Sequence, residues 1–115
     1  MFLINTVRKP SDLHGVGVFA AEAIMKGQVV YRHTRQLDLL FTEVELEELP
    51  KVERDYIRHH GYSDPTTGLW CLDHDDIRDM NFSDSPNVQR LISEEVIALR
   101  AITAGEEMTL ENYRR

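Results

Sequence analysis

The feature that most limits the fold of this chain is the shortness of its apolar runs, which turn residues interrupt repeatedly. The glycine-containing turns in "HGVG", "MKGQ" and "TAGE" precede apolar runs near residues 18–20, 29–31 and 108–110. Short runs rich in β-branched and aromatic residues favour strands over long helices. No run approaches the roughly 20 apolar residues that a membrane-spanning helix needs. The sequence therefore predicts a domain built mostly of short strands.

The segment 42–61 has a helical pattern instead. Thr42, with Glu45 three residues later, forms a capping-box pattern, and Gly61 stands where a helix would end. The apolar residues between them recur at helical spacing: Val44, Leu46, Leu49, Val52, Tyr56 and Ile57. Pro50 would interrupt a single helix, so we expect two short helices, the second beginning near Pro50. The expected fold class is mostly β (α+β), with the helices confined to one insert.

Length and charge narrow the classes of function. A chain of 115 residues suits a single domain, which we expect to cover residues 1–115. Its 20 acidic and 13 basic residues give a net charge of −7, whereas nucleic-acid binding needs a positive surface. We therefore expect no nucleic-acid partner. The acidic balance suits a basic peptide partner, although it also suits solubility alone.

Cysteine usage and the N-terminal residues bear on location. Cys71 is the single cysteine and cannot form an internal disulfide, which is typical of a reducing compartment. The first residues lack the charged start, long apolar stretch and cleavage site of a signal peptide. We expect a cytoplasmic protein without membrane association, or one inside a host cell if it is viral or secreted.

Several familiar kinds of site find little support in the sequence. "HGVG" has fewer glycines than a dinucleotide-binding fingerprint and is followed by a strand-like run. The histidines and Cys71 show no tight ligand spacing, so no metal site is predicted. Ser83 or Ser85 with His74 and Asp76 lacks the Gly-x-Ser-x-Gly turn of a serine nucleophile.

Three motifs follow one another along the chain. They are "HGVGVFAAEAIMKGQVV" near the start, "DIRDMNFSDSPN" late, and "VIALRAITAGEEMT" close to the end. In this order they resemble the SET-domain family of protein lysine methyltransferases, over essentially the whole chain and most strongly its small bacterial or viral members. The resemblance implies a β-clip of short curved sheets in which residues 42–61 are the variable insert. It also implies a knot-like C-terminal segment next to the asparagine-containing strand.

The same resemblance implies a cofactor and a site. Family members bind S-adenosylmethionine on one face and admit a lysine from the opposite face, so that positioning supplies much of the catalysis. The residues that match the cofactor-binding positions are His14, Gly15, Val16, Gly17, Asn81 and Phe82, and Tyr113 matches the catalytic tyrosine. Gly15 and Gly17 are also compatible with an ordinary tight turn. Arg78 matches a commonly basic position or is a surface charge, and Pro86 and Asn87 are expected to shape their loop.

Two departures from the family pattern keep a second interpretation open. Phe82 replaces the usual histidine, so it keeps a stackable ring but lacks ring nitrogens. Tyr113 lies one residue beyond the family spacing from Gly105, which in a regular strand turns a side chain to the other face. A β-bulge would restore Tyr113 to the site. The alternative to an enzyme is a catalytically degenerate SET-like module that binds a peptide or protein partner.

The wall of the lysine channel is a further open point. Many family members complete it with a cysteine-rich zinc-binding extension, which one cysteine cannot build. Tyr56, Tyr62 and Trp70 in or near the insert are candidates for the wall, with packing into the core as their alternative role. A homodimer in which a second subunit completes each site is a hypothesis.

Overall fold

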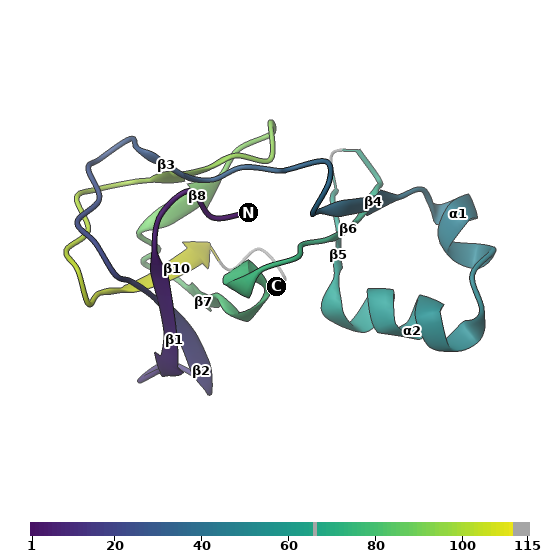
Figure 1. Ribbon diagram of the computed structural model, residues 1–115, viewed down its shortest axis with the longest axis horizontal. Coiled ribbons are helices and arrows are strands. Elements are labelled where there is room, and N and C mark those ends of the chain that lie inside the picture. The colour runs from purple at the N-terminus through teal and green to yellow at the C-terminus, as the bar shows by residue number, and fades with distance from the viewer. Residues whose placement is uncertain (66, 112–115) are drawn as a thin grey trace.

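The computed structural model describes residues 1–65 and 67–111. Figure 1 shows most of the short strands toward the left of the view, from both ends of the chain, and a lobe with the two α-helices toward the right. The strands are β1 (Thr6–Pro10), β2 (Val16–Ala20), β3 (Val29–Tyr31), β4 (Leu39–Phe41), β5 (Tyr62–Ser63), β6 (Trp70–Leu72), β7 (Asn81–Ser83), β8 (Val88–Arg90), β9 (Val96–Ala98) and β10 (Glu107–Glu111). The helices are α1 (Glu43–Glu47), α2 (Lys51–His60) and the 3₁₀ helix η1 (Asp76–Asp79). This mostly β arrangement confirms the predicted fold class.

The largest sheet joins segments from both ends of the described chain in the order β1-β2-β10-β7. β10 pairs antiparallel with β2, where Met108 faces Val18. On its other side it pairs parallel with β7, where Leu110 faces Phe82. The asparagine-containing motif therefore lies beside the last described strand, as the family resemblance predicts.

Two smaller sheets complete the fold. One has the order β3-β9-β8 and the other the order β4-β6-β5. In Figure 1 the second of these lies with α1 and α2 in a lobe beside the remaining strands. The main core lies between the β1-β2-β10-β7 sheet and the β3-β9-β8 sheet, both of which contribute residues to it. Its fully buried members include Val18, Val30, Tyr31, Val88, Val96, Ile102 and Met108.

The insert forms the two predicted helices. Thr42 caps α1 through the predicted capping box with Glu45, and Gly61 caps the C-terminal end of α2. The apolar residues of the insert are less buried than helical spacing suggests: Leu46 and Ile57 are buried, but Val52 is 81% exposed. No helix among the described residues has the length and apolar character to cross a membrane.

The motif "DIRDMNFSDSPN" is more regular than its composition suggests. A stretch this dense in Asn, Asp, Ser and Pro is typical of an irregular loop, yet the motif contains η1 and β7. The Asp75 side chain caps η1 by accepting a hydrogen bond from the amide of Ile77. The backbone of β7 is held by its parallel pairing with β10, a partner that lies far along the sequence.

Candidate functional site

The Asn81 side chain brings the three sequence motifs together. Asn81 opens β7, and its Nδ2 donates to the carbonyl oxygens of His14, at 2.9 Å, and Val16, at 3.4 Å. The same nitrogen lies 2.9 Å from carboxylate Oε2 of Glu107 in β10. One carboxamide thus ties the asparagine motif to the glycine-containing turn and to the C-terminal strand.

Gly15 and Gly17 serve this arrangement in different ways. Gly15 has a φ of +46°, a left-handed conformation that favours glycine, and a β-carbon there would meet nothing within 4 Å. Gly17 is buried, and a β-carbon on it would lie 2.8 Å from the Glu107 carboxyl carbon. Gly15 therefore makes the turn beside open space, whereas Gly17 allows β2 to approach Glu107.

Glu107 also belongs to the candidate site, although the residues expected from the sequence to form the site did not include it. Its Oε1 accepts a hydrogen bond of 2.7 Å from the Ser11 hydroxyl, and Oε2 accepts from Asn81. The signal available in the sequence was an acidic residue directly before Met108, at the start of an apolar strand. A charge in that position needs polar partners, and here Ser11 and Asn81 supply them.

Asn87 fixes the position of β10. It is 4% exposed, its Nδ2 donates to the Glu107 carbonyl at 2.8 Å, and its Oδ1 accepts from the Thr109 amide at 2.9 Å. A side-chain amide that matches one backbone carbonyl and one backbone N–H acts like a short piece of neighbouring strand. Asn87 therefore joins its own loop to β10.

Phe82 faces the other side of β7 from Asn81. Successive side chains of a strand point to opposite faces, and Phe82 packs against the main core. It also lines a cavity of about 370 Å³, together with Met80, Leu110 and the exposed Arg78. β7 thus separates the Asn81 cluster from a cavity on the opposite face.

This cavity, here called the Phe82 cavity, has a mixed polar lining. Histidine and aspartate side chains contribute to it, and Arg8 pairs with Asp79 across 3.1 Å at its wall. Within residues 1–65 and 67–111, no three histidine, cysteine, aspartate or glutamate side chains are placed to hold a metal ion. Of the three aromatic residues considered for the channel wall, Tyr62 lines this cavity.

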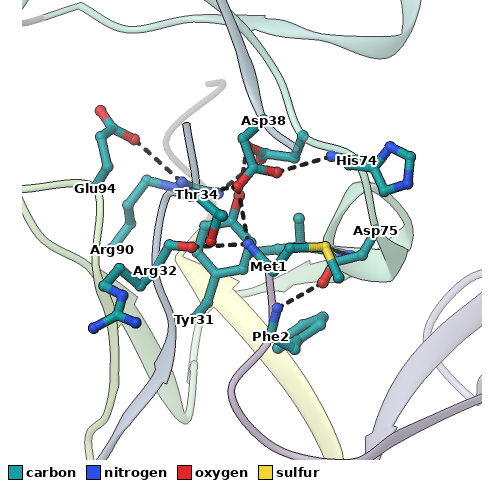
Figure 2. Close-up of polar contacts among 12 residues, drawn as sticks. Met1, Phe2, Tyr31, Arg32, Thr34, Asp38, His74, Asp75, Arg90 and Glu94 are labelled. Carbon is teal, nitrogen blue, oxygen red and sulfur yellow. Dashed lines mark hydrogen bonds and ion pairs between the residues drawn. The ribbon is translucent and has the colours of Figure 1, made fainter. Parts of the chain in front are cut away.

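A buried carboxylate anchors the segment that leads to η1. Figure 2 shows Asp38 accepting hydrogen bonds from the amides of Thr34, at 2.7 Å, and His74, at 3.0 Å, and from the Met1 ammonium, at 2.9 Å. Burial alone would raise the pKa of Asp38, but these hydrogen bonds together lower it. The Phe2 amide in turn donates to Asp75, the residue that caps η1.

Arg90 connects β5 to the main core. Its guanidinium lies 5.4 Å from the Tyr31 ring centre and 4.8 Å from that of Tyr62. It also pairs with Asp73 at 3.5 Å and with Glu94 at 3.2 Å, the second contact being drawn in Figure 2. The Tyr62 hydroxyl donates to Glu94, and burial raises the pKa of this phenol, so it remains protonated.

The predicted cofactor-binding residues are thus divided by β7. His14, Gly15, Val16, Gly17 and Asn81 come together on one side, and Phe82 lies on the other. The predicted catalytic residue, Tyr113, and the predicted bulge before it lie outside the described residues. The last described residue of β10 is Glu111.

Comparisons with known proteins agree with this arrangement. A family model for the SET domain matches residues 15–113, whereas no curated protein matches the chain. A solved structure of a candidate histone methyltransferase from Plasmodium falciparum has a TM-score of 0.69 at 21% sequence identity, covering 97% of this chain and 96% of that one.

Two further solved structures are humanized mutants of the Polycomb Repressive Complex 2 from Chaetomium thermophilum, each bound to an inhibitor. They have TM-scores of 0.68 and 0.66 at identities of 25% and 24%. Each match covers 96% of this chain but 15% of the Polycomb chain, so the likeness concerns one part of a much longer protein. Because the family model spans most of the sequence and the solved structures share its fold, the protein belongs to the SET domain family.

Proposed function

We propose that this protein transfers a methyl group from S-adenosylmethionine to a lysine side chain of another protein. The observation that supports the proposal is the Asn81 cluster, in which the glycine-containing turn, the asparagine loop and Glu107 meet through one carboxamide. These are the motifs that carry the resemblance to the SET family. Membership of the family supports methyl transfer as the reaction class. The Asn81 cluster supports the proposed position of the cofactor.

The chemistry of the cluster suits the amino-acid end of S-adenosylmethionine. The Asn81 Nδ2 already donates to protein acceptors, and none of the described residues donates to its Oδ1. This oxygen and the Glu107 carboxylate are acceptors, which an ammonium group needs. Open space beside Gly15 leaves room for a ligand against the backbone.

The opposite face of β7 suits the lysine. When bound, S-adenosylmethionine would supply the methyl group from a positively charged sulfonium. A lysine attacks only as the neutral amine, and a nearby positive charge favours that form. We propose that the Phe82 cavity receives the lysine and that the Tyr113 hydroxyl aims its nitrogen.

The proposed substrate is a protein segment with a basic character. The net charge of −7 favours the approach of such a segment. The names of the solved relatives mention a histone methyltransferase and a Polycomb complex, and both support a protein substrate. We propose that residues 1–115 form a single domain, with residues 42–61 as its insert.

Calorimetric titration with S-adenosylmethionine tests the cofactor first. We expect saturable binding that Asn81→Ala weakens by about tenfold or more. Transfer of a labelled methyl group to a mixture of basic proteins then tests the reaction, with Tyr113→Phe as the catalytic control. Undiminished transfer by Tyr113→Phe would show that another group aims the amine.

A non-catalytic SET-like module is the second candidate. The observation that favours it is Phe82, whose ring packs against the core where the family usually has a histidine. Absence of binding at near-millimolar S-adenosylmethionine would rule out the enzyme and leave this module. If the cofactor binds, the methyl-transfer assay decides between the two.

A further inference from the structure

An apolar groove lies on the insert, away from the Asn81 cluster. Its volume is about 410 Å³, and side chains of β4 and α2 form most of its lining, among them Leu39, Phe41, Val52, Tyr56 and Ile57. We call it the insert groove. The amphipathic pattern of α2 produces it, because the apolar side of the helix faces the edge strand β4 without closing over it.

The lining of the insert groove is unusually exposed. Val52 is 81% exposed, Leu39 48% and Tyr56 47%. Contiguous apolar side chains on the surface of a soluble protein mark contact sites for a partner. Exposure of two aliphatic residues and one aromatic residue around one hollow therefore indicates that bulky apolar side chains bind here.

A carboxylate gives the insert groove a charge preference. Glu53 lines it, and none of the described residues forms an ion pair or a side-chain hydrogen bond with Glu53. Other charges on α2 are paired: Lys51 with Asp55, and Arg58 with Glu43. An apolar hollow with one unpaired carboxylate at its wall is complementary to apolar residues next to a lysine or arginine.

The insert groove continues toward the Phe82 cavity. Leu39, Tyr56 and Leu72 also line a neighbouring hollow of about 290 Å³. The other side of that hollow is formed by Asp73, His74 and Arg78, which line the Phe82 cavity as well. Lining residues are thus shared from the insert groove to the neighbouring hollow, and from that hollow to the Phe82 cavity.

We propose that the insert groove docks a segment of the substrate protein that lies outside the methylated lysine. The segment carries two bulky apolar side chains and a lysine or arginine that pairs with Glu53. The identity of the occupant rests on the proposed function, because the shared walls lead to the cavity proposed for the target lysine. Docking there would make the choice of substrate depend on residues of the substrate protein other than the lysine that is methylated.

The first experiment identifies the preferred segment without relying on methylation. Random peptides of about 12 residues, displayed on phage, are selected on the full chain, and enriched peptides are measured by fluorescence anisotropy. We expect enrichment of two bulky apolar residues with a lysine or arginine. Val52→Asp should weaken binding by about tenfold or more, because it places a charge where apolar side chains dock.

Matched variants separate docking from general damage. Val44→Asp introduces the same change at a residue that is 67% exposed on α1 and does not line the groove, so binding should be unchanged. Glu53→Lys should shift the enriched charge from basic to acidic residues. Circular dichroism of the three variants should match the wild type, since each altered side chain is exposed.

Three results would overturn the docking proposal. One is equal peptide binding by the wild type and Val52→Asp. Another is an unchanged preference for basic residues in Glu53→Lys. The third is sedimentation showing a wild-type dimer that Val52→Asp converts to a monomer, which would make a second copy the occupant.

Titration with S-adenosylmethionine distinguishes this failure from failure of the proposed function. Cofactor binding without peptide enrichment would leave the proposed function intact and remove the docking site. Peptide enrichment without cofactor binding would remove the enzyme and with it the substrate as the occupant. Support for the whole proposal requires both binding events in the same protein.

Discussion

Gly17 and Glu107 approach each other so closely that the structure leaves no room for a β-carbon on Gly17. Such an atom would lie 2.8 Å from the Glu107 carboxyl carbon and 3.1 Å from the Ser11 β-carbon. Hydrogen bonds from Ser11 and Asn81 hold the carboxylate in place. The requirement for glycine at this position therefore comes from a carboxylate in a distant strand.

Gly17→Ala should destabilise the protein by about 1–3 kcal/mol, because the added methyl group overpacks the Glu107 carboxylate. Denaturant unfolding measures the change in the free energy of unfolding. The control is a double-mutant cycle with Glu107→Ala, in which removal of the carboxylate relieves the clash. The combined loss should be smaller than the sum of the single losses, and an additive result would contradict this explanation.

Asn81→Asp should cost about 2–3 kcal/mol at neutral pH, because it directs a carboxylate at Glu107 and at two carbonyl oxygens. Such surroundings raise the pKa of the new carboxyl group in the folded state above its unfolded value of about 4. The loss should therefore grow as the pH rises above about 4 and diminish on acidification. Urea unfolding of the variant and wild type at pH 7 and pH 5 measures it, and an equal loss at both values would contradict the prediction.

Asn87→Ala should destabilise the protein by about 2–4 kcal/mol. The change leaves the Glu107 carbonyl and the Thr109 amide without the partners that Asn87 supplies. Thermal unfolding provides the measurement. Gln89→Ala, at an exposed position of β8, is the matched control and should change stability by less than about 0.5 kcal/mol. Similar losses in both variants would argue against the bridging role of Asn87.

The lowered pKa of Glu106 predicts that the stability of the protein depends on pH. A hydrogen bond from Arg100, supported by the Thr103 amide, lowers the pKa of Glu106 to about 2. A carboxyl group with a lowered folded-state pKa adds stability above its unfolded pKa of about 4.3 and loses it as the pH falls toward 2. The pair is solvent-accessible, so its contribution is about 1 kcal/mol or less.

Glu106→Gln tests this assignment. The stability difference between wild type and variant should be largest near pH 6 and shrink near pH 3, and moderate salt should reduce it. Chemical unfolding at the two pH values provides the comparison. A difference that does not change with pH would place the acid sensitivity elsewhere.

Local signals made parts of the fold predictable. The Thr42 and Glu45 capping pair, Pro50 and Gly61 are close in sequence to the helix ends that they determine. Short turns likewise located β2, β3 and β10. These features depend on neighbouring residues, so a single sequence contains the information.

Features that depend on distant partners were harder to predict. β7 has an irregular composition and is a strand because β10 pairs with it. Glu107 belongs to the site because Ser11 and Asn81 reach it across the sheet. Helical spacing located the apolar side of α2, but whether anything covers that side depends on the surrounding elements, and Val52 remains exposed.

The strand order β1-β2-β10-β7 also has a consequence for how the protein is made. β10 is the last described strand, yet it lies inside the sheet between β2 and β7. Pairings between segments so far apart in sequence form slowly, since a long loop must close first. During synthesis, β2 and β7 leave the ribosome before the strand that joins them. The β1-β2 pair and β7 therefore cannot join into one sheet until residues 107–111 have been synthesised.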